Sequence, residues 1–332
     1  MLTPHIPRAL RLFIAAYGAL VLAYLLGLHN PYWAAMPVFV VMQPNRQDLL
    51  LRGVFRMVGT LIGGGIGLAA LLYIDNPHLI AAVLVVVVAL SASIAYWIGT
   101  IYAYATMLVG ITCVVIIIPG LGGHAEPVPL AVDRVWCTLI GVVAVTLTTF
   151  FSTPPRKESA PLRADHSVTA SLARFVTAGG IVAIAMAVLN FAGGMAAMGF
   201  ALGASIFATV IGSFPKPQLL FLNMPLGASM GVVLGLIYRG LGAEFDLSPD
   251  VMIVLAAVFI GLGSYLRANP KTQAFGLDIN MVFLISAEVG LSLHTYPELL
   301  MGGVALIGAA LMCTFIFRAM LIYVQRVHKR EK

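Results

Sequence analysis

Two carboxylates lie within one apolar stretch of this sequence, and both could carry a proton. Asp278 stands near the start of the run QAFGLDINMVFLISAEVGL, and Glu288 stands near its end. A charge inside hydrocarbon costs about 2.5–3.5 kcal/mol on insertion scales, so such groups indicate function. A carboxylate in a low-dielectric helix can bind and release a proton near neutral pH. We therefore predict proton coupling by Asp278 and Glu288. The alternative is a carboxylate that is paired with a neighbouring arginine or hydrogen-bonded at the membrane interface.

Two arginines have the chemistry for binding an anion. Arg52 and Arg56 stand four residues apart and therefore lie on one face of a helix. A guanidinium recognises a carboxylate through two parallel hydrogen bonds. We predict that both arginines contact an anionic substrate, the alternative being that they extend to lipid headgroups.

The segment NPYWAAMPVFVVMQPNR is short, contains Pro37 and closes at Gln43. Short or proline-interrupted helices at corresponding positions of two repeats are the best sequence indication of a central transport site. Tyr32 and Trp33 could stack on a substrate there, although an interfacial aromatic belt is the better explanation of the two. Asn280 could line a path or bridge two helices. We include Tyr32, Trp33, Gln43 and Asn280 among the candidate substrate residues.

The sequence contains no enzyme or metal-site motif of the common kinds, such as HExxH, GxSxG or a P-loop. Its three cysteines stand at unrelated spacings in apolar runs, which predicts neither a disulfide framework nor a metal site. Four histidines fall on the outer turns: His29, His78, His124 and His294. Because they lack carboxylate spacing, we expect them to be inert, with metal or pH sensing as the alternative. Basic residues are scattered singly or in pairs, which favours lipid over nucleic acid as the surrounding partner. We predict no enzyme activity and no cofactor.

Composition places the chain in a membrane. Of 332 residues, 61% are apolar and 10% are charged, against roughly 45–50% and 25% in globular proteins. A soluble domain is thereby excluded, and an all-α polytopic membrane protein with about twelve helices is predicted. We expect spans near 9–28, 31–45, 49–73, 78–97, 100–119, 128–151, 172–191, 194–213, 218–240, 249–266, 272–293 and 298–324.

The distribution of basic residues predicts the orientation. All 19 Lys and Arg residues except Arg134 and Arg239 fall on the side of the N-terminus. Because basic residues accumulate on the cytoplasmic side, we expect both termini in the cytoplasm. The polar stretch 152–171 is predicted to be a cytoplasmic linker between the membrane regions 1–151 and 172–325, and 326–332 a basic cytoplasmic tail.

The two membrane regions look like copies of each other. A ridge of glycines four residues apart occurs in both, at Gly59, Gly63 and Gly67 and again at Gly227, Gly231 and Gly235. Such ridges let helix backbones approach closely in lipid, so we assign these glycines to helix packing. Six helices per copy predict two parallel repeats related by an axis along the membrane normal. Alignment of the copies places Met107 opposite Asp278.

The string NPYWAAMPVFVVMQPNRQDLLLRGVFRMVGTLIGGGIG resembles the signature of the fusaric acid resistance and aromatic acid exporter family. The matching residues are Asn30, Pro31, Tyr32, Trp33, Gln43, Pro44, Arg56, Gly59, Thr60 and Gly63. The runs YAYATMLVGIT and AFGLDINMVFL are also similar to that family. The resemblance implies an inner-membrane exporter of aromatic carboxylic acids, driven by the proton-motive force and often working with a periplasmic membrane-fusion adaptor. It adds Arg56 and the Pro31–Pro44 segment to the functional elements.

The leading hypothesis is a multi-pass secondary efflux transporter in the bacterial inner membrane. An aromatic anion would bind between the halves with its carboxylate near Arg56, while protonation of Asp278 or Glu288 biases the conformational state. Two alternatives stay open, a non-transporting membrane scaffold or assembly component and a passive anion channel. The expected partners are substrate, protons and lipid, and the sequence leaves a homo-oligomer open.

Overall fold

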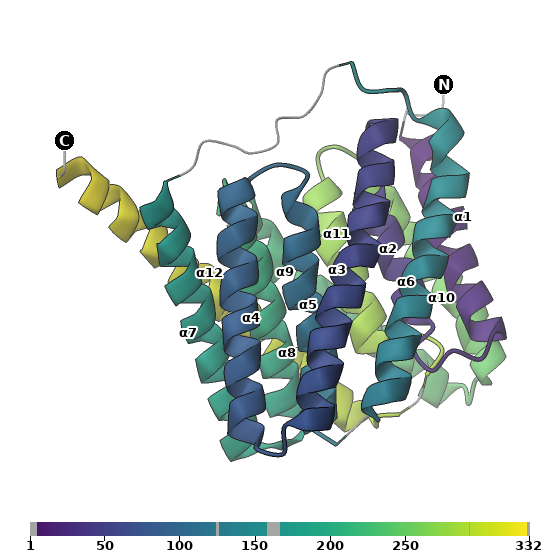
Figure 1. Ribbon diagram of the computed structural model, residues 1–332. Helices are drawn as coiled ribbons and strands as arrows, with labels where there is room; N and C mark the ends of the chain where they lie inside the picture. The colour runs from purple at the N-terminus through teal and green to yellow at the C-terminus, as the bar shows by residue number, and fades with distance from the viewer. Residues whose placement is uncertain (1–4, 124–125, 158–166, 292, 331–332) are drawn as a thin grey trace. The chain divides into compact units, whose positions relative to one another are not determined.

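The computed structural model describes residues 5–123, 126–157, 167–291 and 293–330, and the regular structure in these ranges is helical (Figure 1). The helices are α1 (Ile6–Leu25), α2 (Tyr32–Val41), α3 (Arg46–Tyr73), α4 (Pro77–Ile98), α5 (Ala103–Leu121), α6 (Pro127–Thr149), α7 (Val168–Ala192), α8 (Gly194–Ser213), α9 (Leu220–Glu244), α10 (Pro249–Ala268), α11 (Gln273–Ala287) and α12 (Tyr296–Arg330). Two short 3-10 turns, Phe150–Ser152 and Pro217–Leu219, follow α6 and precede α9.

Proline stands in the first turn of α1, α4 and α10, and α4 shows the local boundary signals most fully. α4 begins at Pro77, whose fixed φ suits the first helical turn and whose missing N–H costs nothing there. The Asn76 side chain accepts a hydrogen bond from the backbone N–H of His78 at 2.9 Å, a normal N-terminal cap. α4 ends at Gly99, which adopts the left-handed conformation with φ of 63° that glycine tolerates.

Ten of the described helices are long and apolar enough to cross a membrane, which confirms a polytopic all-α membrane protein. α2 and α11 are shorter than the predicted spans 31–45 and 272–293, with 10 and 15 residues. At 1.5 Å per residue they extend about 15 and 22 Å, against a hydrocarbon core of about 30 Å. The backbone turns extended at Met42 and left-handed at Glu288, and these turns end the two helices. Crossing by all twelve helices stays a prediction.

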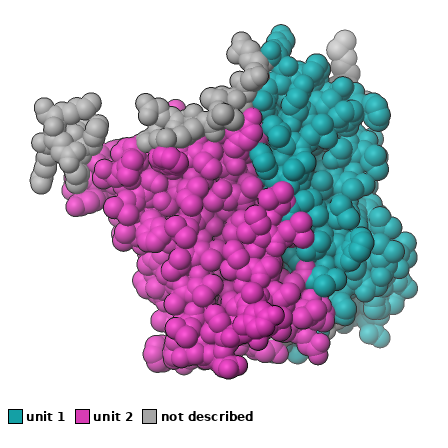
Figure 2. Space-filling view, in the orientation of Figure 1, with its two compact units in different colours: residues 1–57, 132–158, 226–303 teal, residues 58–131, 159–225, 304–332 magenta. Residues whose placement is uncertain are grey.

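The chain forms two compact units, coloured separately in Figure 2. Unit 1 contains residues 1–57, 132–158 and 226–303, and unit 2 contains residues 58–131, 159–225 and 304–332. Each unit therefore takes segments from both halves of the sequence. Every third helix along the chain (α3, α6, α9 and α12) contributes to both units.

Within unit 1, α1 packs against α2 and α10, and α11 packs against the same two helices. Three aromatic rings from α9, α10 and α11 fill the interior. Tyr238, Phe259 and Phe283 have ring centroids 5.1–5.8 Å apart. The Tyr238 hydroxyl donates to the carbonyl oxygen of Met252 at 2.9 Å, which satisfies its polar end.

Within unit 2, α4 packs against α5, α7 and α8, and α8 also packs against α5 and α7. The Arg174 guanidinium of α7 lies 3.5 Å from the centroid of the Tyr96 ring, a cation–π contact. Ser171 donates to the carbonyl oxygen of Ser93 at 2.9 Å. The helix contacts of the two units correspond when helices six apart in number are treated as equivalent. The contacts α1–α2, α1–α10, α11–α2 and α11–α10 of unit 1 then match α7–α8, α7–α4, α5–α8 and α5–α4 of unit 2.

The predicted linker 152–171 is only partly described, because residues 158–166 lie outside the described ranges. Its first part is anchored to the start of α3 in unit 1. Arg156 forms an ion pair with Asp48, and its backbone N–H donates to the Gln47 side chain at 2.6 Å. At the other end of the chain, α12 continues helically to Arg330 through most of the predicted tail.

Candidate functional site

α2 is the shortest α-helix in the described ranges, and every one of its residues except Val40 is buried. It packs against α11, the second short helix, within unit 1 (Figure 1). A cluster of charged or polar side chains lies at each end of this pair. α2 carries no charged residue of its own. The backbone N–H and C=O groups at its two ends lack partners within the helix, so polar side chains from other helices bind them.

The turn before α2 is held by Asp133 of α6, whose side chain is 2% exposed. One carboxylate oxygen accepts the backbone N–H of His29 at 2.9 Å. The other accepts the backbone N–H of Asn30 at 2.8 Å and the Asn30 side-chain amide at 3.1 Å. A carboxylate at the N-terminal end of a helix is also favoured by the helix dipole. Asp133 is therefore a structural anchor for the start of α2.

Tyr32 and Trp33 are both buried at this same end of α2. The Tyr32 hydroxyl donates to the Asn30 side-chain oxygen at 3.3 Å. The Arg134 guanidinium lies 5.0 Å from the centroid of the Trp33 ring. The structure thus places both aromatic side chains in packed contacts next to the Asp133 anchor.

The C-terminal end of α2 is met by arginines. Arg52 of α3 donates from Nη1 to the carbonyl oxygen of Val40 at 3.0 Å, and Arg267 of α10 donates from Nε to that of Phe39 at 3.0 Å. Gln43 donates to the neighbouring carbonyl oxygen of Met42 at 2.7 Å. Cations are stabilising at the C-terminal end of a helix, where carbonyl groups lack intrahelical partners.

Arg267 also connects α2 to the start of α11. Its Nη1 donates to the carbonyl oxygen of Gln273 at 3.0 Å, and its guanidinium is attracted electrostatically by Asp278. Asp278 is partly buried on the second turn of α11. Arg56, one turn beyond Arg52 on α3, is 5% exposed. Asp278 and Arg52 therefore belong to one charged cluster, at the opposite end of α2 from Tyr32 and Trp33.

Asn280 lies two residues after Asp278 and is 1% exposed. Its amide nitrogen donates to the carbonyl oxygen of Gly276 one turn earlier at 2.6 Å. The side chain packs directly against Gly263 of α10, where any larger residue would displace it. The structure thus places Asn280 between α10 and α11, as a group that bridges helices.

Glu288 ends α11 and is 8% exposed. Its carboxylate pairs with the imidazole of His294. Arg239 of α9 closes the same turn by donating to the carbonyl oxygens of Leu291 at 2.9 Å and His294 at 2.8 Å. The expectation that His294 is inert misses this pairing. His29 and His78 lie on turns as predicted, and His124 lies outside the described residues.

The hydrogen bond with Glu288 raises the pKa of His294 above its ordinary value, and Glu298 adds to this while burial and Arg239 oppose it. Because the folded-state pKa is raised, the pair contributes stability that is complete below about pH 6.5 and is lost as the pH rises through the folded-state pKa. We expect the unfolding temperature of the purified protein to fall over that range. The His294→Gln variant should lose this pH dependence, whereas His78→Gln should retain it. An unaltered pH profile in His294→Gln would contradict the assignment.

The two short helices run side by side in opposite directions. Pro31, before α2, lies close to Gly290, after α11, such that a Cβ on Gly290 would be 2.6 Å from the proline ring. At the other end, Arg267 joins Phe39 near the close of α2 to Gln273 at the start of α11. Asp278 and Glu288 are ten residues apart along α11, about 15 Å of helix. Two titratable acids thus stand near opposite ends of one short apolar pair.

The six predicted packing glycines lie at two direct helix contacts, α3 on α5 in unit 2 and α9 on α11 in unit 1. A Cβ on Gly59 would lie 2.6 Å from the carbonyl oxygen of Ala105 and 2.7 Å from the Cβ of Leu108. A Cβ on Gly227 would lie 3.1 Å from the carbonyl oxygen of Phe275 and 2.5 Å from the Cβ of Asp278. The contacts of Gly63, Gly67, Gly231 and Gly235 continue these two series. Asp278 therefore occupies, opposite Gly227, the position that Leu108 occupies opposite Gly59. The sequence alignment of the two copies predicts Met107 as the equivalent of Asp278, which differs by one residue.

A matched pair in α3 tests the glycine contacts. A Cβ on Gly63 would collide with the carbonyl oxygen of Val109, whereas a Cβ on Gly65 has no atom within 4 Å. We expect Gly63→Ala to lower the free energy of unfolding by about 1–3 kcal/mol, because backbone must move to admit the methyl group. Gly65→Ala should unfold like the wild type in the same detergent titration. Equal stability of the two variants would rule out close backbone packing here.

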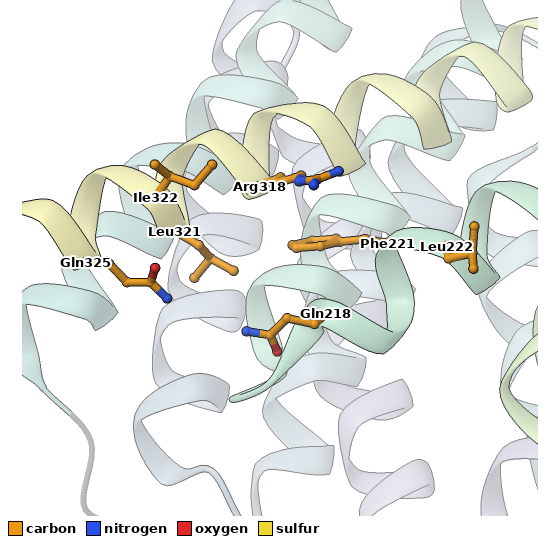
Figure 3. Close-up of a pocket in the computed structure, with 7 residues that line it drawn as sticks. All are labelled: Gln218, Phe221, Leu222, Arg318, Leu321, Ile322 and Gln325. Atoms are coloured by element: carbon orange, nitrogen blue, oxygen red, sulfur yellow. The ribbon is translucent and has the colours of Figure 1, made fainter.

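A surface groove of about 500 Å³ lies in unit 2, between the start of α9 and the end of α12 (Figure 3). Its lining residues are Gln218, Phe221, Leu222, Arg318, Leu321, Ile322 and Gln325. None of the predicted site residues is among them. The groove therefore shares no residue with the charged clusters of unit 1.

Three residues that contribute to these clusters escaped the sequence reasoning. Asp133 is an acid inside an apolar run, so the rule that selected Asp278 would have selected it too. Arg267 entered only as one of many basic residues near helix ends, and its contact with Phe39 spans 228 positions. His294 is expected to be inert from its place on a turn, although Glu288 stands six residues before it and pairs with it in the structure.

Comparison with known proteins identifies a family and two relatives. The model of the Fusaric acid resistance protein family matches residues 8–183, more than half of the chain. The p-hydroxybenzoic acid efflux pump subunit AaeB of Edwardsiella tarda (strain FL6-60) is 26% identical over 163 residues, which cover 44% of this chain and 25% of that protein. The subunit of the same name from Edwardsiella ictaluri (strain 93-146) is 26% identical over 160 residues, with 42% and 24% covered. The match thus spans about a quarter of these relatives. No solved structure matches the chain.

Proposed function

The chain belongs to the fusaric acid resistance protein family, and on that premise we propose that it exports aromatic carboxylic acids or similar organic anions, driven by the proton gradient. Membership confirms the resemblance seen in the string that begins at Asn30. The observation that carries the proposal is the α2–α11 pair. These short apolar helices have an arginine cluster with Asp278 at one end and the Glu288–His294 pair at the other, in a membrane protein.

Substrate binding is assigned to the arginine end of α2. Arg52 and Arg56 lie one turn apart on α3, and Arg52 reaches the end of α2. A guanidinium pairs well with the carboxylate of an aromatic acid. The relatives' printed name supports a hydroxybenzoate-like anion as the substrate class. Tyr32 and Trp33 lie at the other end of α2, so contact with them requires the substrate to move along the helix.

Proton coupling is assigned to α11, with Asp278 and Glu288 as the two acids. A carrier that exports an anion against its gradient needs a second site whose occupancy differs between conformational states. Asp278 lies beside Arg267 in the arginine cluster, and Glu288 pairs with a titratable imidazole at the far end. Protonation at either position would alter the charge balance at one end of α2.

We further propose a multi-pass inner-membrane protein of two parallel six-helix repeats, with both termini in the cytoplasm. The shared helix contacts in the two units support the repeat, as do the equivalent glycine contacts of α3 and α9. The excess of Lys and Arg near the N-terminal side supports the orientation. The word subunit in the relatives' name supports a partner protein, which we propose is a periplasmic membrane-fusion adaptor.

Uptake of labelled 4-hydroxybenzoate into everted membrane vesicles tests the function. We expect accumulation that depends on an imposed proton gradient and is abolished by an uncoupler. Flux that does not depend on the proton gradient would contradict a proton-driven carrier and favour a passive anion channel. No flux of any of a dozen aromatic acids, from protein shown to be folded and inserted, would favour a non-transporting scaffold.

A further inference from the structure

The arginines around the end of α2 come close enough to repel one another. Arg52 and Arg267 donate to the carbonyl oxygens of consecutive residues, Val40 and Phe39, each at 3.0 Å. Their guanidinium groups therefore lie side by side, although they come from α3 and α10. Arg8 at the start of α1 adds a third guanidinium whose field acts on Arg267.

The charges that act on Arg267 are mostly of its own sign. In the described chain, the guanidinium groups of Arg8 and Arg52 outweigh the one carboxylate that acts appreciably on Arg267, that of Asp278. The C-terminal end of α2 adds roughly half a negative charge through the helix dipole. Arg11, one turn beyond Arg8, adds positive charge next to Arg8. The surroundings of Arg267 therefore favour a further negative charge.

The cluster also has a donor ready for a ligand. In the described part of the chain, the hydrogen bonds of Arg267 use Nε for Phe39 and Nη1 for Gln273. These two bonds hold the guanidinium plane in place and leave Nη2 for another acceptor. A held guanidinium whose Nη2 is left for an acceptor suits a charge-assisted hydrogen bond to a carboxylate oxygen.

We propose that Arg8, Arg52 and Arg267 form a capture site for a small organic carboxylate at the C-terminal end of α2. The site deepens the proposed function and rests on it for the identity of the anion as transported substrate. A bound carboxylate would place a second negative charge next to Arg267, where Arg8 and Arg52 outweigh Asp278. Arg52 and Arg267 would bind the anion while they also donate hydrogen bonds to the end of α2. Binding of the anion would therefore act directly on the position of α2.

Binding of benzoate to the purified protein in neutral detergent tests the site, with benzamide as the uncharged analogue. At matched ionic strength, benzoate should raise the unfolding temperature and benzamide should not. Arg267→Gln should weaken benzoate binding by about tenfold, since it removes a charge-assisted hydrogen-bond donor. Arg267 also holds α2, so Arg8→Gln provides a variant without a hydrogen bond to that helix and should weaken binding about threefold. Arg318→Gln, in the groove of unit 2, should bind benzoate like the wild type.

Three results would overturn the site. Benzoate and benzamide could act equally, or Arg8→Gln and Arg267→Gln could both bind benzoate with wild-type affinity. Alternatively, added phosphatidylglycerol could give the Arg267-dependent stabilisation while benzoate gives none, which would make the anion a lipid headgroup. Vesicle transport separates this proposal from the function. If benzoate binding depends on Arg267 but the protein transports nothing, the binding site is supported and the transport function is rejected. If the Arg267→Gln variant transports with an unaltered KM, the transport function is supported and the binding site is rejected.

Discussion

Asp278→Asn is expected to reduce gradient-driven accumulation of aromatic acid in everted vesicles by about tenfold or more, equivalent to at least about 1.4 kcal/mol of lost coupling. The amide matches the carboxylate in shape but cannot take up and release a proton. It also removes the charge that attracts Arg267 at the end of α2. Accumulation should fall while the amount of folded protein in the membrane stays the same.

The matched control is Asp250→Asn, which neutralises another acid of unit 1. Asp250 lies at the start of α10 and accepts a hydrogen bond from the Tyr24 hydroxyl at 2.9 Å on the exposed surface. This variant should accumulate substrate normally. If Asp278→Asn also accumulates normally while Glu288→Gln fails, coupling belongs to the Glu288 end of α11. Normal accumulation in both variants would remove α11 from the coupling mechanism.

Asp133→Ala is expected to lower the free energy of unfolding by on the order of 3 kcal/mol or more, because hydrogen bonds to a buried charged group contribute about 1.5–3 kcal/mol each. The substitution removes the acceptor for two backbone N–H groups and one amide at the start of α2. Those donors stay in a site where the carboxylate is 2% exposed. Thermal or detergent unfolding of the purified variants measures the effect.

Two further variants serve as comparisons for the unfolding of Asp133→Ala. Asp133→Asn keeps one acceptor oxygen and should fall between the wild type and the alanine variant. Asp75→Ala removes an exposed acid from the turn between α3 and α4 and should leave the unfolding transition unchanged. If Asp133→Ala unfolds like Asp75→Ala, the three hydrogen bonds contribute nothing to stability.

The helices were predictable because apolar runs and their Pro and Gly breaks are local signals. Pro77 and Gly99 bound α4 within two residues of the predicted span. The lengths of α2 and α11 were not predictable in the same way. The end of α11 depends on the left-handed backbone of Glu288 and its pairing with His294, which the apolar pattern does not encode.

The candidate site was predictable by residue type but not by geometry. Intramembrane charge pointed to Asp278 and Glu288, and spacing pointed to Arg52. The partners of these residues come from distant segments, and no local pattern joins Arg267 to Phe39. Tyr32 and Trp33 were expected to share a site with the arginines, yet a helix separates them. Pairings of this kind arise from the fold and require the folded structure.

The glycine contacts between α9 and α11 have a mechanical consequence. At Gly231, the α9 backbone touches α11 with no side chain between, since a Cβ there would lie 2.7 Å from that of Val282 and 2.9 Å from the carbonyl oxygen of Ile279. Two surfaces meshed this closely cannot slide past each other by rotamer adjustment. We therefore expect α11 and the part of α9 from Gly227 to Gly235 to move together in any conformational change. α2 is held at its two ends by side-chain hydrogen bonds, which can exchange partners more easily than such a backbone contact can slide.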